Sequence, residues 1–284
     1  MSSGKKGKIW INSLVMLLFI CAAILPMDLS AQEENEKVYK IDPWIDGGIV
    51  AGALVLSKFA IDAQNEQPLL LEDEVLSLDP QSVNAFDRGA IYQDPDKIGD
   101  AIDNSDLALN ITTGLVLLLA LDKEVRHHWL EGIVMFTEAM TVNAAMQGWV
   151  AYGTNRYRPI AYMENVDLNK RTDSRNKNSF YSGHTSSAAT TSFFMAKMFS
   201  DLHPEMGNKK YWLYAAALIP PAVVGAYRIQ GGKHFYTDVM VGTIMGAATG
   251  ILIPHFHKLT GNNNMSLIPI VQPDVLGMHF SMNL

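Results

Sequence analysis

The stretch RIQGGKHFYTDVMVGTIMGAATGILIPHFH, residues 228–257, decides the fold. An arginine and two glycines lead into an apolar run that carries Gly242, Gly246 and Gly250 at intervals of four. Small residues at this spacing share one face of a helix and allow a second helix to approach closely. The stretch therefore predicts a helix over residues 238–257 that packs tightly in a helical bundle.

Five further segments have helical length and apolar composition. They cover residues 47–60, 107–121, 129–152, 184–199 and 211–229. Pro220 and Pro221 predict a kink in the last of them. A membrane span needs about 20 mostly apolar residues, and several of these segments are shorter or more polar. Glu138, within the third, is either a functional buried carboxylate or a satisfied structural one, and we expect the second.

Composition limits the class of protein. The chain has 284 residues, 48% of them hydrophobic, and a mean hydropathy of +0.06, between soluble enzymes and compact membrane proteins. We expect an all-α helical bundle, membrane-embedded with about six spans, and keep a soluble helical domain as the alternative. The net charge of −7 argues against a nucleic-acid partner. Cys21 is the single cysteine, so no internal disulfide is possible.

The N-terminus resembles a targeting segment. Lys5, Lys6 and Lys8 precede an apolar run, so residues 1–31 are expected to be a signal peptide or a first membrane helix. The expected organisation continues with an extracytoplasmic polar segment holding one short helix, a helical domain and an extended tail. These parts cover residues 32–106, 107–258 and 259–284.

Basic loops suggest an orientation in the membrane, because Lys and Arg concentrate on the cytoplasmic side. The basic residues concerned are Lys123, Arg126, Lys209, Lys210 and Lys258. All fall on the cytoplasmic side if the N-terminal segment leaves the cytoplasm and residues 47–60 do not span. If residues 47–60 span, the orientation reverses. We expect the first arrangement, in a bacterial cell membrane.

His234 and Asp238 lie four residues apart, so one helical turn puts them on the same face. Asp238 can accept a hydrogen bond from one imidazole nitrogen and leave the other free to attack phosphorus. The alternative is a helix-capping aspartate beside an incidental histidine. Arg228, six residues earlier, can grip two phosphate oxygens.

Ser182, Gly183 and His184 open another expected helix. A helix N-terminus presents unpaired N–H groups that suit an anion. His184 can protonate a leaving oxygen. Arg156 and Arg158 follow the third segment, which Pro159 ends. Two histidines, a carboxylate, a serine and arginines at helix ends together indicate metal-free phosphoryl transfer through a histidine.

These motifs resemble the type 2 phosphatidic acid phosphatase superfamily, which includes lipid phosphatases, bacterial acid phosphatases and vanadium haloperoxidases. The family pattern is Lys-x6-Arg-Pro, Pro-Ser-Gly-His and Ser-Arg-x5-His-x3-Asp, and the resemblance covers roughly residues 107–257. It implies that His234 is the nucleophile, that Asp238 orients it and that His184 is the general acid. It also implies a phosphate cradle, with no metal and no cofactor. The cradle residues are Arg158, Arg228, Ser182 and Gly183.

The chain departs from the family pattern at three positions. Tyr181 replaces the proline and Tyr227 replaces the serine. Ala151 stands where the family has lysine, which removes a cation from the cradle. A charge-assisted hydrogen bond contributes about 1.5–3 kcal/mol. Arg156 lies near in sequence, and we predict that it substitutes for that lysine as a phosphate ligand.

The expected function is hydrolysis of a lipid phosphate or diphosphate through a phosphohistidine intermediate, at a site on the outer, periplasmic face of the membrane. The lipid and the bilayer are the expected partners, and the oligomeric state is open. One alternative is a soluble periplasmic acid phosphatase of broad specificity. A vanadate-binding haloperoxidase and a non-catalytic lipid-binding membrane protein are the others.

Overall fold

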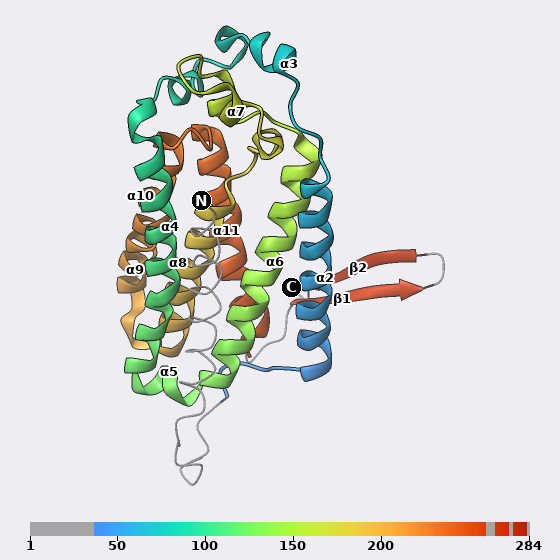
Figure 1. Ribbon diagram of the computed structural model, residues 1–284. Helices are drawn as coiled ribbons and strands as arrows, with labels where there is room; N and C mark the ends of the chain where they lie inside the picture. Colours follow the sequence, from blue (N-terminus) through green and yellow to red (C-terminus); the bar gives the residue numbers. More distant parts are fainter. Residues whose placement is uncertain (1–36, 260–264, 273–274, 283–284) are drawn as a thin grey trace, which may run out of the picture.

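The computed structural model describes residues 37–259, 265–272 and 275–282 (Figure 1). The long helices are α2 (Pro43–Asn65), α4 (Ile98–Leu115), α6 (Trp129–Thr154), α8 (Gly183–Leu202), α10 (Ile219–Gln230) and α11 (Tyr236–His257). The short ones are α3 (Glu72–Leu76), α5 (Lys123–His127), α7 (Leu168–Arg171) and α9 (Lys210–Ala216). The 3₁₀ turns are η1 (Pro80–Ser82), η2 (Arg88–Ile91), η3 (Pro95–Lys97), η4 (Val116–Leu121), η5 (Pro159–Tyr162), η6 (Ser174–Lys177) and η7 (Pro204–Lys209). Strands β1 (Met265–Gln272) and β2 (Val275–Met282) form an antiparallel pair.

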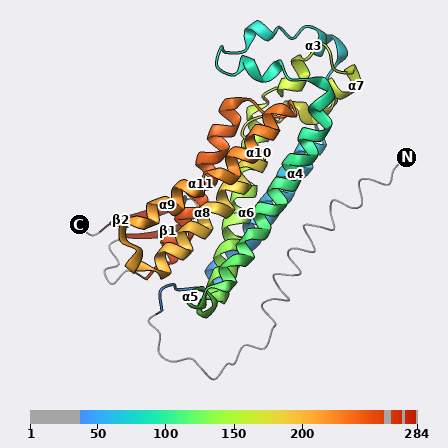
Figure 2. The same cartoon turned by 90° about the vertical axis from the view of Figure 1, so that its left-hand side faces the viewer.

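The long helices form one bundle in which α8 contacts α4, α6, α10 and α11 (Figures 1 and 2). The glycine stripe of α11 lies directly against the backbone of α8. A Cβ placed at Gly246 would lie 2.1 Å from the carbonyl oxygen of Ser186, and one at Gly250 would lie 2.5 Å from that of Thr190. Only glycine permits this approach, which confirms the packing that the four-residue spacing predicts.

We expect Gly246→Ala to destabilise the bundle strongly. The added methyl group must push α11 away from Ser186, and overpacking of this kind costs about 1–3 kcal/mol. The thermal midpoint in detergent should fall by several degrees. Gly52→Ala is the matched control, because a Cβ at Gly52 meets nothing within 4 Å. An unchanged midpoint for Gly246→Ala would contradict the close approach of the helices.

The expected helices are all present, and two of them are longer than predicted. The kink predicted at Pro220 is a break between α9 and α10. Helix α4 begins at Ile98, so the domain boundary predicted at residue 106 falls inside a helix. The polar first turns of α4 hide its start, because hydrophobicity marks only its later part.

Helix α2 also corrects an expectation. It covers 23 residues rather than residues 47–60, because the Asp42 side chain caps it by accepting from the backbone N–H groups of Trp44 and Ile45. At this length α2 is one of four described segments long and apolar enough to cross a membrane. The others are Pro95–Leu121, Pro204–Gln230 and Tyr236–His257.

Large apolar side chains are exposed on these helices, as expected for a surface that faces lipid. Examples are Phe59 on α2, Ile111 on α4, Trp212 on α9 and Ile244 on α11. These observations identify a membrane protein. The expected targeting segment, residues 1–31, lies outside the described residues, and the tail expected to be extended contains the β1–β2 pair.

The acidic segment between α2 and α4 covers the end of the bundle at which α6 ends and α11 begins (Figure 1). Glu74 accepts a hydrogen bond from the Tyr157 hydroxyl and lies 3.4 Å from Lys177 Nζ. Asp87 lies fully buried and accepts from the backbone N–H of Thr237 on α11. The segment is therefore an ordered cover rather than a solvated linker.

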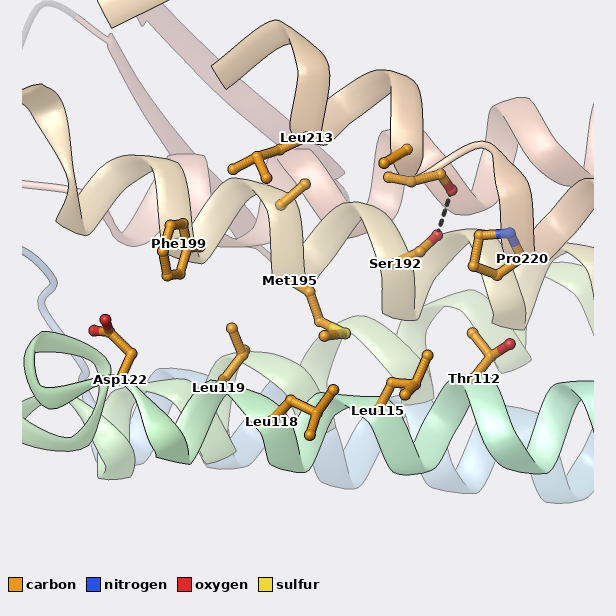
Figure 3. Close-up of a pocket in the computed structure, with 13 residues that line it drawn as sticks. Thr112, Leu115, Leu118, Leu119, Asp122, Ser192, Met195, Phe199, Leu213 and Pro220 are labelled. Atoms are coloured by element: carbon orange, nitrogen blue, oxygen red, sulfur yellow. Dashed lines mark hydrogen bonds between the residues drawn. The ribbon is translucent and has the colours of Figure 1, made fainter. Parts of the chain in front are cut away.

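An apolar cavity of about 350 Å³ opens lower in the bundle, between α4 with η4, α8 and α9 (Figure 3). Leu115, Met195 and Leu213 line it, and the Ser192 hydroxyl donates to the carbonyl of Ala217 at its wall. No predicted site residue lines this cavity.

Candidate active site

His234 lies in the turn between α10 and α11 and is almost completely buried. Its Nδ1 lies 2.7 Å from the carbonyl oxygen of Ser179. A carbonyl only accepts, so Nδ1 carries the proton and Nε2 keeps its lone pair. Burial, followed by the charges of Arg228 and Arg158, lowers the pKa of His234 to about 3. The ring is therefore neutral at physiological pH, as an attacking nitrogen must be.

Asp238 does not hold His234 in the way that the spacing predicts. Its Oδ2 lies 3.8 Å from His234 Nδ1, beyond hydrogen-bond range. It accepts instead from the Ser179 hydroxyl at 2.6 Å and from the Phe235 backbone N–H at 2.8 Å. Asp238 thus orients the imidazole through Ser179, whose carbonyl oxygen accepts a hydrogen bond from the Nδ1–H of His234.

Arg156 is engaged by carboxylates, and its role as a substitute for the lysine stays a prediction. Its guanidinium lies 2.5 Å from Asp238 Oδ1 and 2.7 Å from Asp87 Oδ2, and it also donates to the Thr237 hydroxyl. It stacks 4.4 Å above the Phe235 ring. Two fully buried carboxylates hold Arg156 behind His234, so its charge is already balanced there.

Arg158 and Arg228, which we predict to hold the phosphate, are close enough for their positive charges to repel each other. Arg228 is buried and Arg158 is partly buried, and the Nε atom of each is buried with no hydrogen-bond partner among the described residues. Burial, followed by the charges of Arg228 and Arg175, lowers the pKa of Arg158 to about 9. The two guanidinium groups repel each other and have buried donors without partners among the described residues. A bound anion would offset this repulsion and accept hydrogen bonds from these donors.

His184 stands at the start of α8 with its side chain about one-third exposed (36%). Its Nε2 lies 3.0 Å from Asp106 Oδ1 on α4. Asp106 also lies 4.0 Å from Arg228, and Arg228 donates to the Ser105 hydroxyl at 3.3 Å. His184 is therefore oriented beside the arginine pair and is more accessible than His234, as a group that exchanges protons with a leaving oxygen needs to be.

The remaining predicted ligands have structural contacts of their own. Ser182 is fully buried and caps α8, with its hydroxyl 2.8 Å from that of Thr185. Gly183 packs against Gln147, whose side chain a Cβ would meet at 3.0 Å. The structure thus shows the helix cap at this position, and the backbone of α8 presents its N-terminus to the site.

Lys233 was missed by sequence reasoning. It is the residue before His234, its backbone N–H donates to the carbonyl of Arg228, and its side chain is partly buried. Burial, followed by the charges of Arg158 and Arg228, lowers the pKa of Lys233 to about 7. A third basic side chain is therefore affected by the charges of Arg158 and Arg228, whereas Ala151 is buried within α6.

Comparison with known proteins gives two results and one absence. A family model described as the PAP2 superfamily matches residues 132–261. Among solved structures, the chain is similar to the crystal structure of a transmembrane PAP2-type phosphatidylglycerolphosphate phosphatase from Bacillus subtilis. The identity is 19%, the match covers 74% of this chain and 94% of that chain, and the TM-score is 0.40. No curated protein sequence is significantly similar to this chain. The resemblance that the three motifs predict is therefore confirmed over residues 132–261, the part of the chain that matches the model of the PAP2, or type 2 phosphatidic acid phosphatase, superfamily.

Proposed function

We propose that the chain is a lipid phosphatase that acts through a phosphohistidine at His234. The supporting observation is the neutral imidazole of His234, with Nε2 unprotonated, close to the unused buried donors of Arg158 and Arg228. A tetrahedral phosphate can accept from both guanidinium groups while it faces a nitrogen nucleophile.

The proposed reaction has two steps. His234 Nε2 forms a bond to phosphorus as the bond to the ester oxygen breaks, and His184 gives its proton to that oxygen. Water then attacks the phosphohistidine, His184 takes a proton from it, and inorganic phosphate leaves while Nε2 recovers its lone pair. Arg158 and Arg228 balance the charge that the equatorial oxygens carry in both steps.

A lipid is the favoured substrate because the site lies at the end of helices that are exposed to lipid. Residues of the site begin α8 and α11 and end α10, and Asp106 belongs to α4. Three of these four helices, α4, α10 and α11, fall within candidate membrane spans. A phosphate head group can thus enter the site while its acyl chains stay in the bilayer.

Phosphate release by the purified protein in detergent tests the proposal. We expect release from phosphatidic acid, phosphatidylglycerol phosphate or a polyprenyl diphosphate in the presence of a chelator. Equal turnover of short water-soluble esters would favour an acid phosphatase of broad specificity. Halide oxidation with added vanadate would favour a haloperoxidase. No turnover of any ester, with lipid binding retained, would favour a non-catalytic module.

We propose the outer face of the membrane for the site. The support is the set of basic loops at the opposite end of the bundle, where Lys123, Arg126 and Lys258 lie near the start of α2. A secretion signal at residues 1–31 followed by a spanning α2 would give the reverse orientation. Labelling with an impermeant maleimide decides between the two orientations.

For that experiment, Cys21 is replaced by serine, and cysteine is placed at Phe86 or at Leu121. Phe86 is 59% exposed at the site end, and Leu121 is 76% exposed at the other end. Labelling of intact cells at position 86 alone is expected. Labelling at position 121 alone would place the site on the cytoplasmic face.

A further inference from the structure

A second group of ionisable side chains lies inside the bundle, at the end remote from His234. His257 is the last residue of α11, whose 22 residues place it roughly 30 Å from the start of that helix. Its Nε2 lies 3.3 Å from Asp46 Oδ1 on α2 and 3.4 Å from Glu138 Oε2 on α6. Asp46 is 4% exposed and Glu138 is 3% exposed.

Neighbouring hydrogen bonds aim all three groups at one point. His257 Nδ1 lies 2.8 Å from the carbonyl oxygen of Ile253, which accepts its proton and leaves the Nε2 lone pair facing the two carboxylates. Asp46 Oδ2 accepts from the Asp42 backbone N–H at 2.7 Å, so its Oδ1 is left for His257. Glu138 Oε2 is buried and has no hydrogen-bond partner among the described residues.

This group is rich in acidic side chains. When both carboxylates are ionised and His257 is neutral, it carries two negative charges, and protonation of the imidazole removes only one of them. Lys258, the next residue, is engaged by Asp201 at 2.8 Å. A buried net charge is costly away from water. A divalent cation bound by two carboxylates and a neutral imidazole would bring the net charge to zero.

We propose that Asp46, Glu138 and His257 bind one divalent transition-metal ion, and that Zn²⁺ suits the site best. Zinc takes imidazole nitrogen and carboxylate oxygen at about 2.0–2.2 Å, which sets tetrahedral ligand atoms about 3.3–3.5 Å apart. The two separations from His257 Nε2 match that spacing, and the three ligand atoms lie within 4.8 Å of one another. An imidazole ligand disfavours Mg²⁺ and Ca²⁺, which prefer oxygen ligands.

The surrounding structure supports such a site. The Nδ1–H of His257 bonded to a backbone carbonyl is the outer contact that metal-bound histidines commonly make. A cavity of about 420 Å³ between the first turns of α2 and α6 is lined by Asp46, Pro43 and Thr137, and gives an ion a route inward. The ion would join α2 to α6 and α11, so its role is to hold α2 against the bundle rather than to take part in phosphoryl transfer.

Zinc binding to the full chain in detergent tests this site. The protein, free of any polyhistidine tag, is stripped with a chelator and then titrated with Zn²⁺ against a chromophoric chelator. We expect one equivalent to bind and the thermal midpoint to rise by several degrees, because a ligand that binds only the folded state stabilises it. Glu138→Gln and His257→Asn should each weaken Zn²⁺ binding by at least about 10-fold.

Matched controls separate a site from general metal adsorption. His255→Asn changes an exposed histidine two residues from His257, and Glu131→Gln changes a second carboxylate of α6, so both should bind zinc as the unmodified chain does. If either test variant fails to fold, Asp46→Asn replaces it. Failure of the unmodified chain to bind zinc would show that the three side chains form an ion pair only. The same conclusion would follow if Glu138→Gln and His257→Asn bound zinc as tightly as the unmodified chain does. Equally tight binding of Mg²⁺ would overturn the assignment to a transition metal.

Discussion

His234→Asn is expected to reduce phosphate release by at least about 10³-fold while the protein remains folded. The asparagine amide can take the place of Nδ1 and still donate to the carbonyl of Ser179, but it offers no counterpart of Nε2. The variant should therefore keep the local packing and lose the nucleophile. The measurement is single-turnover phosphate release from a lipid phosphate in detergent.

A chemical trap distinguishes the lost nucleophile from general damage. Acid-sensitive, base-stable phosphate should be attached to the unmodified protein after rapid quenching, and none should be attached to His234→Asn. The exposed His255, at the other end of α11, gives the control variant His255→Asn, which should be labelled normally. A phosphoenzyme of normal yield in His234→Asn would place the nucleophile elsewhere.

The pKa of His234 also predicts how activity depends on pH. Because burial and the two arginines lower the pKa of His234 to about 3, its imidazole is neutral at every pH above that value. Protonation of His234 therefore should not reduce activity between pH 5 and pH 7, although an ordinary histidine titrates near pH 6.5. A loss of activity over this range that arises from protonation of His234 would contradict the burial seen in the structure.

Sequence reasoning succeeds here where the signal is local. The spacing of Gly242, Gly246 and Gly250 predicts a close helix contact, because a helix repeats its faces at fixed intervals, and the backbone of α8 fills that contact. Arg158, Arg228 and His234 each stand at or next to a helix end, and the charges of the two arginines act on His234. The roles of these three residues in phosphoryl transfer stay predictions.

Sequence reasoning fails where the residue that a side chain contacts is distant in the sequence. Asp87 and Asp106 belong to an acidic stretch that resembles a solvated linker, and nothing local shows that they bind Arg156 and His184. Proximity in sequence also does not fix where a side chain points, and Arg156 is an example. A single residue, Tyr157, separates Arg156 from Arg158, yet the Arg156 guanidinium binds two carboxylates and Arg158 Nε has no hydrogen-bond partner among the described residues.

We propose that Lys233 takes the place of the missing lysine of the family pattern, because the positive charges of Arg158 and Arg228 act on its side chain although its position in the sequence is different. Lys233→Gln is expected to raise KM for a lipid phosphate by about 10–100-fold below pH 7, which corresponds to the 1.5–3 kcal/mol of a charge-assisted hydrogen bond. The effect on kcat should be smaller, since phosphate is bound before and during transfer. Lys233→Arg should recover most of the affinity, and Lys170→Gln, which removes an exposed lysine at the same end, should change nothing.

The pH profile gives the sharper test. The pKa of Lys233 is lowered to about 7, and a lysine is charged below its pKa, so the empty site loses one positive charge as the pH rises through that value. KM of the unmodified protein should therefore rise above pH 7, whereas KM of Lys233→Gln should not show that rise. Ionisation of the substrate phosphate affects both proteins equally and cancels in the ratio of their KM values. A ratio that stays constant from pH 6 to pH 9 would remove Lys233 from the cradle and leave Arg158 and Arg228 to hold the phosphate alone.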